Sequence, residues 1–216
     1  MTETEFCLRP MKCELNVLSV PDGSSMFMQG DTSIISAVYG PVEAKVQKML
    51  YDKAHVEVTY NAAKGPPSVN GRVMEKYIKD SCESAIMTTL HPGASVSINV
   101  QELQDSGGIL ACALNASCLA LINASVSMKY TVAAVHCMID KDSDQIIVDP
   151  DNVQIQNSRA SFTYAFDSVR KDVICCHTTG TFLEKDLIAT KKCCKNACQY
   201  IFDFYREIVK KYANII

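Results

Sequence analysis

Polar and apolar residues alternate in short runs near the start of the chain. The alternation is partial over 11–19 and clean over 55–60, while 26–29 and 32–39 are rich in strand-forming residues. Turns containing glycine and aspartate separate the first three runs. This pattern predicts a meander of antiparallel strands, followed by one further strand.

Three longer stretches repeat apolar residues every three or four positions, which is the spacing of one helix face. The first predicted helix covers about 72–90 and ends before Pro92 and Gly93. The second follows the glycine pair at 107–108 and is apolar on nearly all sides, so we expect it in the core. The third begins at about 184 and continues as a long amphipathic helix toward the C-terminus.

The remaining strand-like runs lie between and after these helices. We expect a strand at 94–100 and two hairpins, formed by 130–140 with 145–148 and by 161–167 with 172–177. The order lacks the strict strand–helix alternation of a doubly wound sheet, and no linker, low-complexity tract or clear repeat interrupts it. The pattern therefore predicts one α+β domain over 1–216, with helices packed on a mixed sheet.

Composition narrows the choice of partners. The chain has 216 residues, 48% of them hydrophobic, and a net charge of −3, so any nucleic-acid binding must come from local basic patches. The N-terminal stretch MTETEFCLRP lacks the basic and apolar regions of a signal peptide. Polar residues interrupt the longest apolar run, which favours a buried helix over a membrane span, and we expect no membrane partner.

The cysteines favour reduced thiols over a metal site. There are 11 of them, scattered through apolar segments, as in a cytosolic or nuclear protein. CCH at 175–177 and CCKNAC at 193–198 invite a zinc interpretation. Neither provides the two separated cysteine pairs of a structural zinc site, and we expect no metal.

The glycine pair at 107–108 permits two interpretations. A helix start after glycines is a common place to hold a phosphate, because its N–H groups point outward. However, the next residues are Ile109 and Leu110, which offer an anion no ligand. The residues alone therefore favour a tight turn into the buried helix.

Charged side chains gather in three further places. Arg72, Lys76 and Lys79 share one side of the first predicted helix, where they would contact a phosphodiester backbone or simply form a solvated face. Asp149 and Asp151 could bind a metal or act as an acid, but they lie at a turn, where aspartate is common for backbone reasons, and no paired carboxylates have a defensible catalytic spacing. The last helix carries a set of lysines typical of a solvated face: Lys191, Lys192, Lys195, Lys210 and Lys211.

The order of these pieces is more informative than any one of them. Five segments stand in a distinctive order: GDTSIISAVYGP, GRVMEKYIKDSCESAI, LHPGASVSINVQELQDSGGILACALNASCLALINASV, IIVDP and SRASFTYAFDS. With these segments, the chain from about Leu8 to the C-terminal helix resembles the RNase PH family, and in its details the RNase PH-like ring subunits of the eukaryotic RNA exosome. This resemblance implies a ribosomal-protein-S5-domain-2-like fold.

The same resemblance implies that the phosphorolytic site is degenerate. Active members follow the glycine pair with a serine or threonine and an arginine that hold inorganic phosphate, and here Ile109 and Leu110 occupy those places. Acidic residues of active members correspond to Asn157 and Thr163. Phosphorolysis needs a bound phosphate and a group that assists the leaving oxygen, so we expect neither a catalytic residue nor a phosphate cofactor.

The resemblance also implies partners and a location. We expect a non-catalytic exosome ring subunit that acts in 3′→5′ RNA processing and decay, including that of rRNA, in the nucleus, nucleolus and cytoplasm. Its partners would be other ring subunits and RNA, the latter bound by Arg72, Lys76 and Lys79, with Arg9 as a weaker candidate.

An alternative function stays open at this point. The chain would be a nuclease or nucleic-acid-binding protein that handles RNA or DNA outside the exosome, as a homodimer. In that case a divalent metal would be held by remaining carboxylates, for which the candidates are Asp105, Asp149, Asp151 and Asp167.

Overall fold

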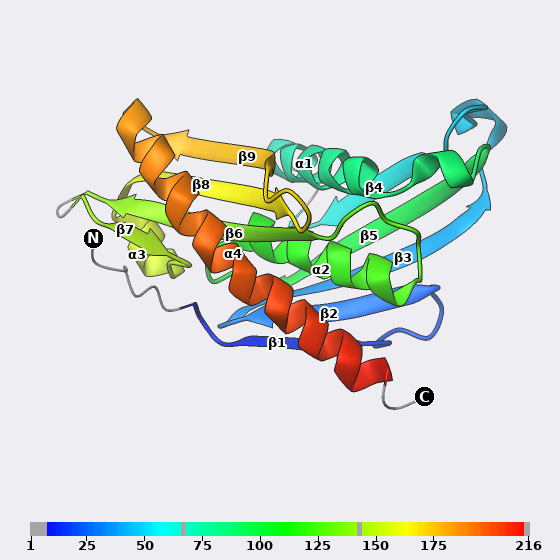
Figure 1. The fold of residues 1–216 in the computed structure, drawn as a ribbon, viewed down its shortest axis with the longest axis horizontal. Helices are drawn as coiled ribbons and strands as arrows, with labels where there is room; N and C mark the ends of the chain where they lie inside the picture. The colour runs from blue at the N-terminus through cyan, green and yellow to red at the C-terminus, as the bar shows by residue number, and fades with distance from the viewer. Residues whose placement is uncertain (1–7, 66–67, 142–143, 214–216) are drawn as a thin grey trace.

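Two β-sheets and the helices packed on them build the protein, as seen in the computed structural model, which describes residues 8–65, 68–141 and 144–213 (Figure 1). The strand order of the first sheet is β1 (Met11–Leu15), β2 (Gly23–Gln29), β3 (Thr32–Glu43), β5 (Ala94–Gln104) and β4 (His55–Asn61). In this sheet β4 and β5 are parallel, and all other neighbouring strands are antiparallel.

The second sheet is antiparallel throughout. Its two edge strands are β7 and β9, so β6 and β8 form its centre. The strand order is β7 (Ile146–Val148), β6 (Val132–Asp140), β8 (Ser158–Asp167) and β9 (Val173–Gly180).

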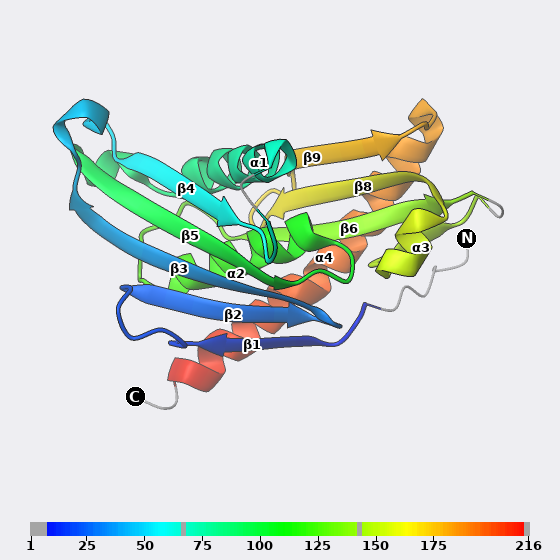
Figure 2. The ribbon, with the colours of Figure 1, turned by 180° about the vertical axis from the view of Figure 1, so that it is seen from behind.

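The helices pack on the two sheets in different places. Helix α2 (Ile109–Asn123) contacts β2 and β3 of the first sheet and β6 of the second, and α1 (Val69–Ala85) packs against β4 and α2. Helix α4 (Glu184–Ala213) crosses β6 and β8 diagonally and ends near β1 (Figures 1 and 2). The short α3 (Asn152–Gln156) lies just before β8. Helix α2 therefore joins the two sheets, which explains why it is apolar on nearly all sides.

A buried polar network fixes α2 between its neighbours. The Asn115 amide donates to the Ala134 carbonyl at 3.0 Å, and the Ala134 N–H donates to Asn115 Oδ1 at 2.8 Å. The Tyr205 hydroxyl of α4 lies 2.9 Å from the same Oδ1 atom. Buried polar groups are stable only when hydrogen-bonded, so this network specifies how α2, β6 and α4 meet.

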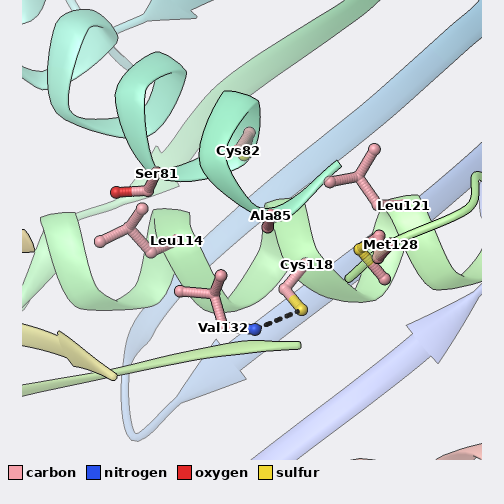
Figure 3. Close-up of a pocket in the computed structure, with 8 residues that line it drawn as sticks. All are labelled: Ser81, Cys82, Ala85, Leu114, Cys118, Leu121, Met128 and Val132. Carbon is pink, nitrogen blue, oxygen red and sulfur yellow. Dashed lines mark hydrogen bonds between the residues drawn. The ribbon is translucent and has the colours of Figure 1, made fainter. Parts of the chain in front are cut away.

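A small cavity lies between α1 and α2 (Figure 3). Its volume is about 10 Å³, and Cys82 and Cys118 contribute to its apolar wall. The Cys118 sulfur accepts the Val132 N–H at 3.3 Å.

The ten cysteines of the described ranges are free thiols, and most are buried. The predicted burial is thus confirmed for all of these residues except Cys176, which is exposed, and Cys193, which is half-buried. No described helix is long and apolar enough to cross a membrane.

The predicted elements are present, but several bounds were wrong. The helix expected at 72–90 runs from Val69 to Ala85, because the Ser68 side chain accepts the Gly71 N–H at 3.1 Å and caps its start. It ends early because Ile86 is extended and bridges to the segment before β6. The strand expected over 11–19 ends at Leu15, and α3 was not expected at all.

Candidate functional site

The glycine turn, the start of α2 and one face of the second sheet enclose a cleft of about 190 Å³. Its floor is a row of three side chains, His136 from β6, Thr163 from β8 and His177 from β9. The strand register places them side by side, because His136 pairs with Thr163 and Thr163 pairs with His177. Met74 reaches the cleft from α1. The cleft is therefore built by elements that are far apart in the sequence.

The glycine pair is required by the turn itself. Gly107 and Gly108 have φ values of 108° and 69°, a region that favours glycine. A Cβ atom on Gly107 would lie 2.8 Å from the Pro150 carbonyl oxygen. The Gly107 N–H donates to Asp105 at 2.9 Å, and its carbonyl accepts the Thr32 hydroxyl at 2.8 Å. These contacts account for both glycines without any bound anion.

Arg9 ties the glycine turn to the segment before α3. Its Nη2 atom donates to Asp149 Oδ1 at 2.6 Å and to the Gly107 carbonyl at 3.2 Å. Its Nη1 atom donates to the Ser106 carbonyl at 3.2 Å and to Asp151 Oδ1 at 3.3 Å. Its backbone N–H also donates to Asp149 Oδ2 at 2.9 Å. One side chain thus holds three chain segments together behind the cleft.

These contacts leave little of Arg9 for an external ligand. Its side chain is only 14% exposed and that of Asp149 only 2%. Burial by itself lowers the pKa of Arg9, but the hydrogen bond and charge of Asp149 outweigh it, and the net pKa is raised. The guanidinium is therefore permanently charged and internally paired. RNA contact by Arg9 stays a prediction, to which this geometry gives no support.

The described lining of the cleft lacks a cation. Among the residues that the structure describes, no lysine or arginine lines the cleft, and Ile109 and Leu110 lie where the helix begins. His136 Nδ1 lies 2.8 Å from the Thr163 hydroxyl, and burial lowers the pKa of His136 to about 4. Burial also lowers the pKa of His177. Near neutral pH both imidazoles are therefore uncharged, and the cleft offers an anion no cationic partner.

The structure brings together three of the four positions expected to be degenerate. Ile109, Leu110 and Thr163 line the cleft. Asn157 lies at the end of α3, exposed and outside the lining. The positions of His136 and His177 in the cleft could not be predicted from the sequence, because they depend on a strand register that no local pattern reveals.

The basic residues of α1 point elsewhere. Arg72 and Lys76 are exposed and Lys79 is half-buried, whereas Met74 and Tyr77 occupy the side of the helix toward the cleft and β9. Tyr77 makes an edge contact with His177 at 5.1 Å between ring centroids. None of the three basic side chains forms an ion pair within the part of the chain that the structure describes.

The carboxylates proposed as metal ligands serve other purposes. Asp149 and Asp151 bind Arg9, and Asp105 accepts the Gly107 N–H. Asp167 accepts the Asp172 N–H at 3.2 Å, at the far end of β8. Among the described residues, no three potential metal ligands come together. This arrangement gives metal-assisted hydrolysis no support.

Comparisons with known proteins agree with this architecture. Residues 7–127 match the family model RNase PH, described as 3′ exoribonuclease family, domain 1. The chain is 31% identical over 157 residues to the exosome complex exonuclease RRP46 homolog of Arabidopsis thaliana, covering 73% of this chain and 65% of that protein. It is 28% identical over 212 residues to the exosome complex component RRP46 of Saccharomyces cerevisiae, covering 93% and 95%.

A solved structure is similar throughout. The crystal structure of rice (Oryza sativa) Rrp46 has a TM-score of 0.90 and 29% identity to this chain, covering 94% of this chain and 96% of that one. The α+β, RNase PH-like fold expected from the sequence is therefore confirmed.

Proposed function

Because the chain belongs to the RNase PH family of 3′ exoribonucleases, we propose that it is a non-catalytic subunit of an RNA exosome ring. Relatives that share nearly its whole length are named as exosome components. The single observation that argues against catalysis is the described lining of the cleft, which contains no lysine or arginine and has Ile109, Leu110 and Thr163 where phosphate ligands and an acidic residue are expected.

The chemistry of phosphorolysis explains why this observation carries weight. The attacking phosphate is an anion that must be held against the 3′-terminal linkage, and developing negative charge must be stabilised. Here Gly107 and Gly108 form the turn that would present the phosphate, but among the described residues no lysine or arginine lines the cleft. The one carboxylate of the described lining, Asp105, would repel a phosphate rather than hold it.

A nuclease assay tests this proposal. The purified chain is incubated with labelled single-stranded RNA, with and without inorganic phosphate and with and without divalent metal. We expect no phosphate-dependent release of nucleoside diphosphates. Phosphate-dependent product that a substitution at Leu110 abolishes would overturn the proposal, since contaminating enzymes would not respond to that change. Metal-dependent product without phosphate would instead favour the alternative, a nuclease that acts on RNA or DNA outside the exosome.

Assembly is the second part of the proposal. We infer that the chain joins other exosome ring subunits and contacts RNA there, in the nucleus, nucleolus and cytoplasm, and that it forms a homodimer in isolation. Open strand edges at β1, β4, β7 and β9 favour association. Light scattering at tens of micromolar gives the mass, and a pull-down identifies the partners. A monodisperse monomer that captures no ring subunit would contradict both statements.

A further inference from the structure

Two histidines of the cleft have ring nitrogens that are accessible to a ligand. His136 of β6 and His177 of β9 lie on one face of the second sheet, on either side of Thr163 of β8. The Nδ1 atom of His136 lies 2.8 Å from the Thr163 hydroxyl oxygen. Nε2 of His136 and both nitrogens of His177 have no hydrogen-bond partner among the described residues, and none of these three atoms is enclosed. They are therefore free to bind from the cleft.

The separation of the two imidazoles suits one shared ion. In an antiparallel sheet the Cα atoms of paired residues lie about 4.5 or 5.5 Å apart, and a residue makes one kind of pair with each neighbouring strand. His136 and His177 pair with Thr163 from its two sides, so their Cα atoms lie about 10 Å apart. Two rings that incline toward each other can span this separation through one ion. The contact with Thr163 already inclines His136 toward β9.

A thioether lines the same cleft. Met74 reaches it from α1, which packs beside β9 (Figure 1). Met74 lies one helical turn before Tyr77, whose ring contacts His177 at 5.1 Å between centroids. Methionine is unbranched and has three rotatable side-chain bonds, so its sulfur can turn toward the imidazoles. Two nitrogen ligands and one sulfur ligand are thus available at one place.

This set of ligands favours a soft ion with a single positive charge. Thioether sulfur selects Cu(I), for which imidazole is also a suitable ligand. Harder divalent ions prefer several oxygen ligands, and no three histidine, cysteine, aspartate or glutamate side chains converge among the described residues. Asp105 lines the cleft as well, but its Oδ1 atom accepts the Gly107 N–H. The start of α2 also opposes a cation, and it opposes a monovalent ion less than a divalent one.

We propose that His136, His177 and Met74 form a Cu(I) site in the cleft. Thr163 is a positioning residue: when Nε2 of His136 binds the metal, Nδ1 carries the proton and donates it to the Thr163 oxygen. The cysteine pattern, from which no metal is expected, does not bear on this site, because none of its ligands is a thiol. The inference goes beyond the proposed function and is independent of it, since neither ring assembly nor the loss of phosphorolysis requires a metal.

Methyl NMR of the full chain tests the site directly. The methionine methyl groups are labelled with ¹³C, and Met74→Leu identifies the signal of Met74. Cys176 and Cys193, which are not buried, and Cys7, which lies outside the described residues, are first replaced by serine so that their thiols do not capture the ion. One equivalent of Cu(I), supplied anaerobically from a chromophoric chelate, should shift the Met74 signal. The signal of Met49, which precedes β5 and lies far from the cleft, should not move.

Competition with the chelate measures the Cu(I) affinity of matched variants. Met74→Leu and His177→Gln should each weaken Cu(I) binding by at least about tenfold, whereas Met49→Leu, the same change outside the cleft, should not. Thr163→Val should weaken binding by about tenfold through the orientation of His136, and Thr163→Ser, which keeps the hydroxyl, should restore it. Zn²⁺ should bind more weakly than Cu(I), and Met74→Leu should leave its affinity unchanged.

Three results would overturn the proposal. A Met74 signal that stays in place at one equivalent of Cu(I) would show that Met74 is not a ligand. Equal Cu(I) affinities of Met74→Leu and its parent would place the copper elsewhere. Tighter binding of Zn²⁺ than of Cu(I) would identify an imidazole site without the thioether. An exchange of methionine for leucine typically costs less than about 1.5 kcal/mol, so the variant should fold, and Met74→Ile replaces it if it does not.

Discussion

The cleft and the basic side of α1 differ in what each has kept. The cleft has a backbone shape that two glycines and Arg9 hold in place, but its described lining contains no lysine or arginine. The basic side of α1 carries Arg72, Lys76 and Lys79, and none of the three forms an ion pair with a described residue. Internal contacts therefore fix the backbone at the cleft, whereas the cations of α1 are available to an external ligand.

The largest expected effect on stability comes from breaking the ion pair between Arg9 and Asp149, which lies behind the cleft. Replacing Asp149 by asparagine removes the charge opposite Arg9 while keeping a residue that tolerates the φ of 57° at this position. Leaving a buried charge without its partner typically costs about 3 to 5 kcal/mol. We therefore expect Asp149→Asn to lower the free energy of unfolding by about 3 kcal/mol, measured by urea denaturation.

The neighbouring carboxylate provides the matched control. Asp151 contacts the same guanidinium, but its side chain is 64% exposed. Exposed ion pairs contribute up to about 1 kcal/mol, so Asp151→Asn should have a much smaller effect. Equal losses in the two variants would show that Arg9 is not the central support of the turn.

The second largest expected effect is a loss of stability at acidic pH, which comes from the buried His136 in the cleft. The pKa of His136 is lowered to about 4, so the folded protein disfavours its protonated form. Below pH 6.5 the unfolded chain binds a proton that the folded chain does not, and stability falls as the pH drops from about 6.5 toward about 4. The contribution of His136 to this loss is at most about 3 kcal/mol.

Denaturation at a series of pH values measures this contribution. His136→Asn keeps a polar group near Thr163 and should flatten the pH dependence between about 6.5 and 4. Some slope should remain from His177, whose pKa is also lowered by burial. An unchanged slope in His136→Asn would mean that folding does not lower the pKa of His136.

The sequence predicted more of the fold than of the site. Periodic runs with clear turns located the helices and strands, because burial of one face repeats along each element. The cap at Ser68 and the end at Ala85 were missed, since a side-chain hydrogen bond and a bridge to Met128 decide them. Ile109 and Leu110 were found because they follow the glycines directly. The row of His136, Thr163 and His177 was not, because pairing between distant strands creates it.

The ion pairs of Arg9 with Asp149 and Asp151 also depend on contacts between distant parts of the sequence. Asp149 and Asp151 stand together in the sequence, which made a metal site worth considering. Their partner lies 140 and 142 residues away along the chain. No local sequence pattern indicates such a pairing. For the same reason, the sequence did not predict that Arg9 forms ion pairs within the protein.

The smallest expected effect concerns the basic side of α1, and it tests whether free cations there have a function. Changing Arg72, Lys76 and Lys79 to glutamate should weaken binding of single-stranded RNA by about tenfold or more, whatever its sequence, because phosphate contacts carry no base information. The dependence of binding on salt should flatten by roughly 0.7 per lost contact. Anisotropy titrations at several salt concentrations measure both quantities.

The fold should survive this triple change, because the cations lie away from Ile78 and Cys82, which pack into the core. Lys79 lies near Glu83, so a triple glutamine variant checks that repulsion on the helix does not cause the result. The exposed Lys12, Lys45 and Lys129 supply a control triple with the same change of charge.

The outcome separates three roles for this side of α1. Weaker RNA binding with an unchanged melting temperature, absent from the control triple, supports an RNA path over α1. Unchanged binding assigns the three residues to a solvated helix face. A protein that stays folded but falls from dimer to monomer identifies a subunit interface, and RNA binding would then weaken only through the loss of the second copy. Mass and RNA affinity must therefore be measured on the same sample over a series of dilutions. If this side of α1 is an RNA path, the RNA affinity of the variant is low while its mass is still that of a dimer. If it is a subunit interface, the mass of the variant falls first and the RNA affinity falls with it.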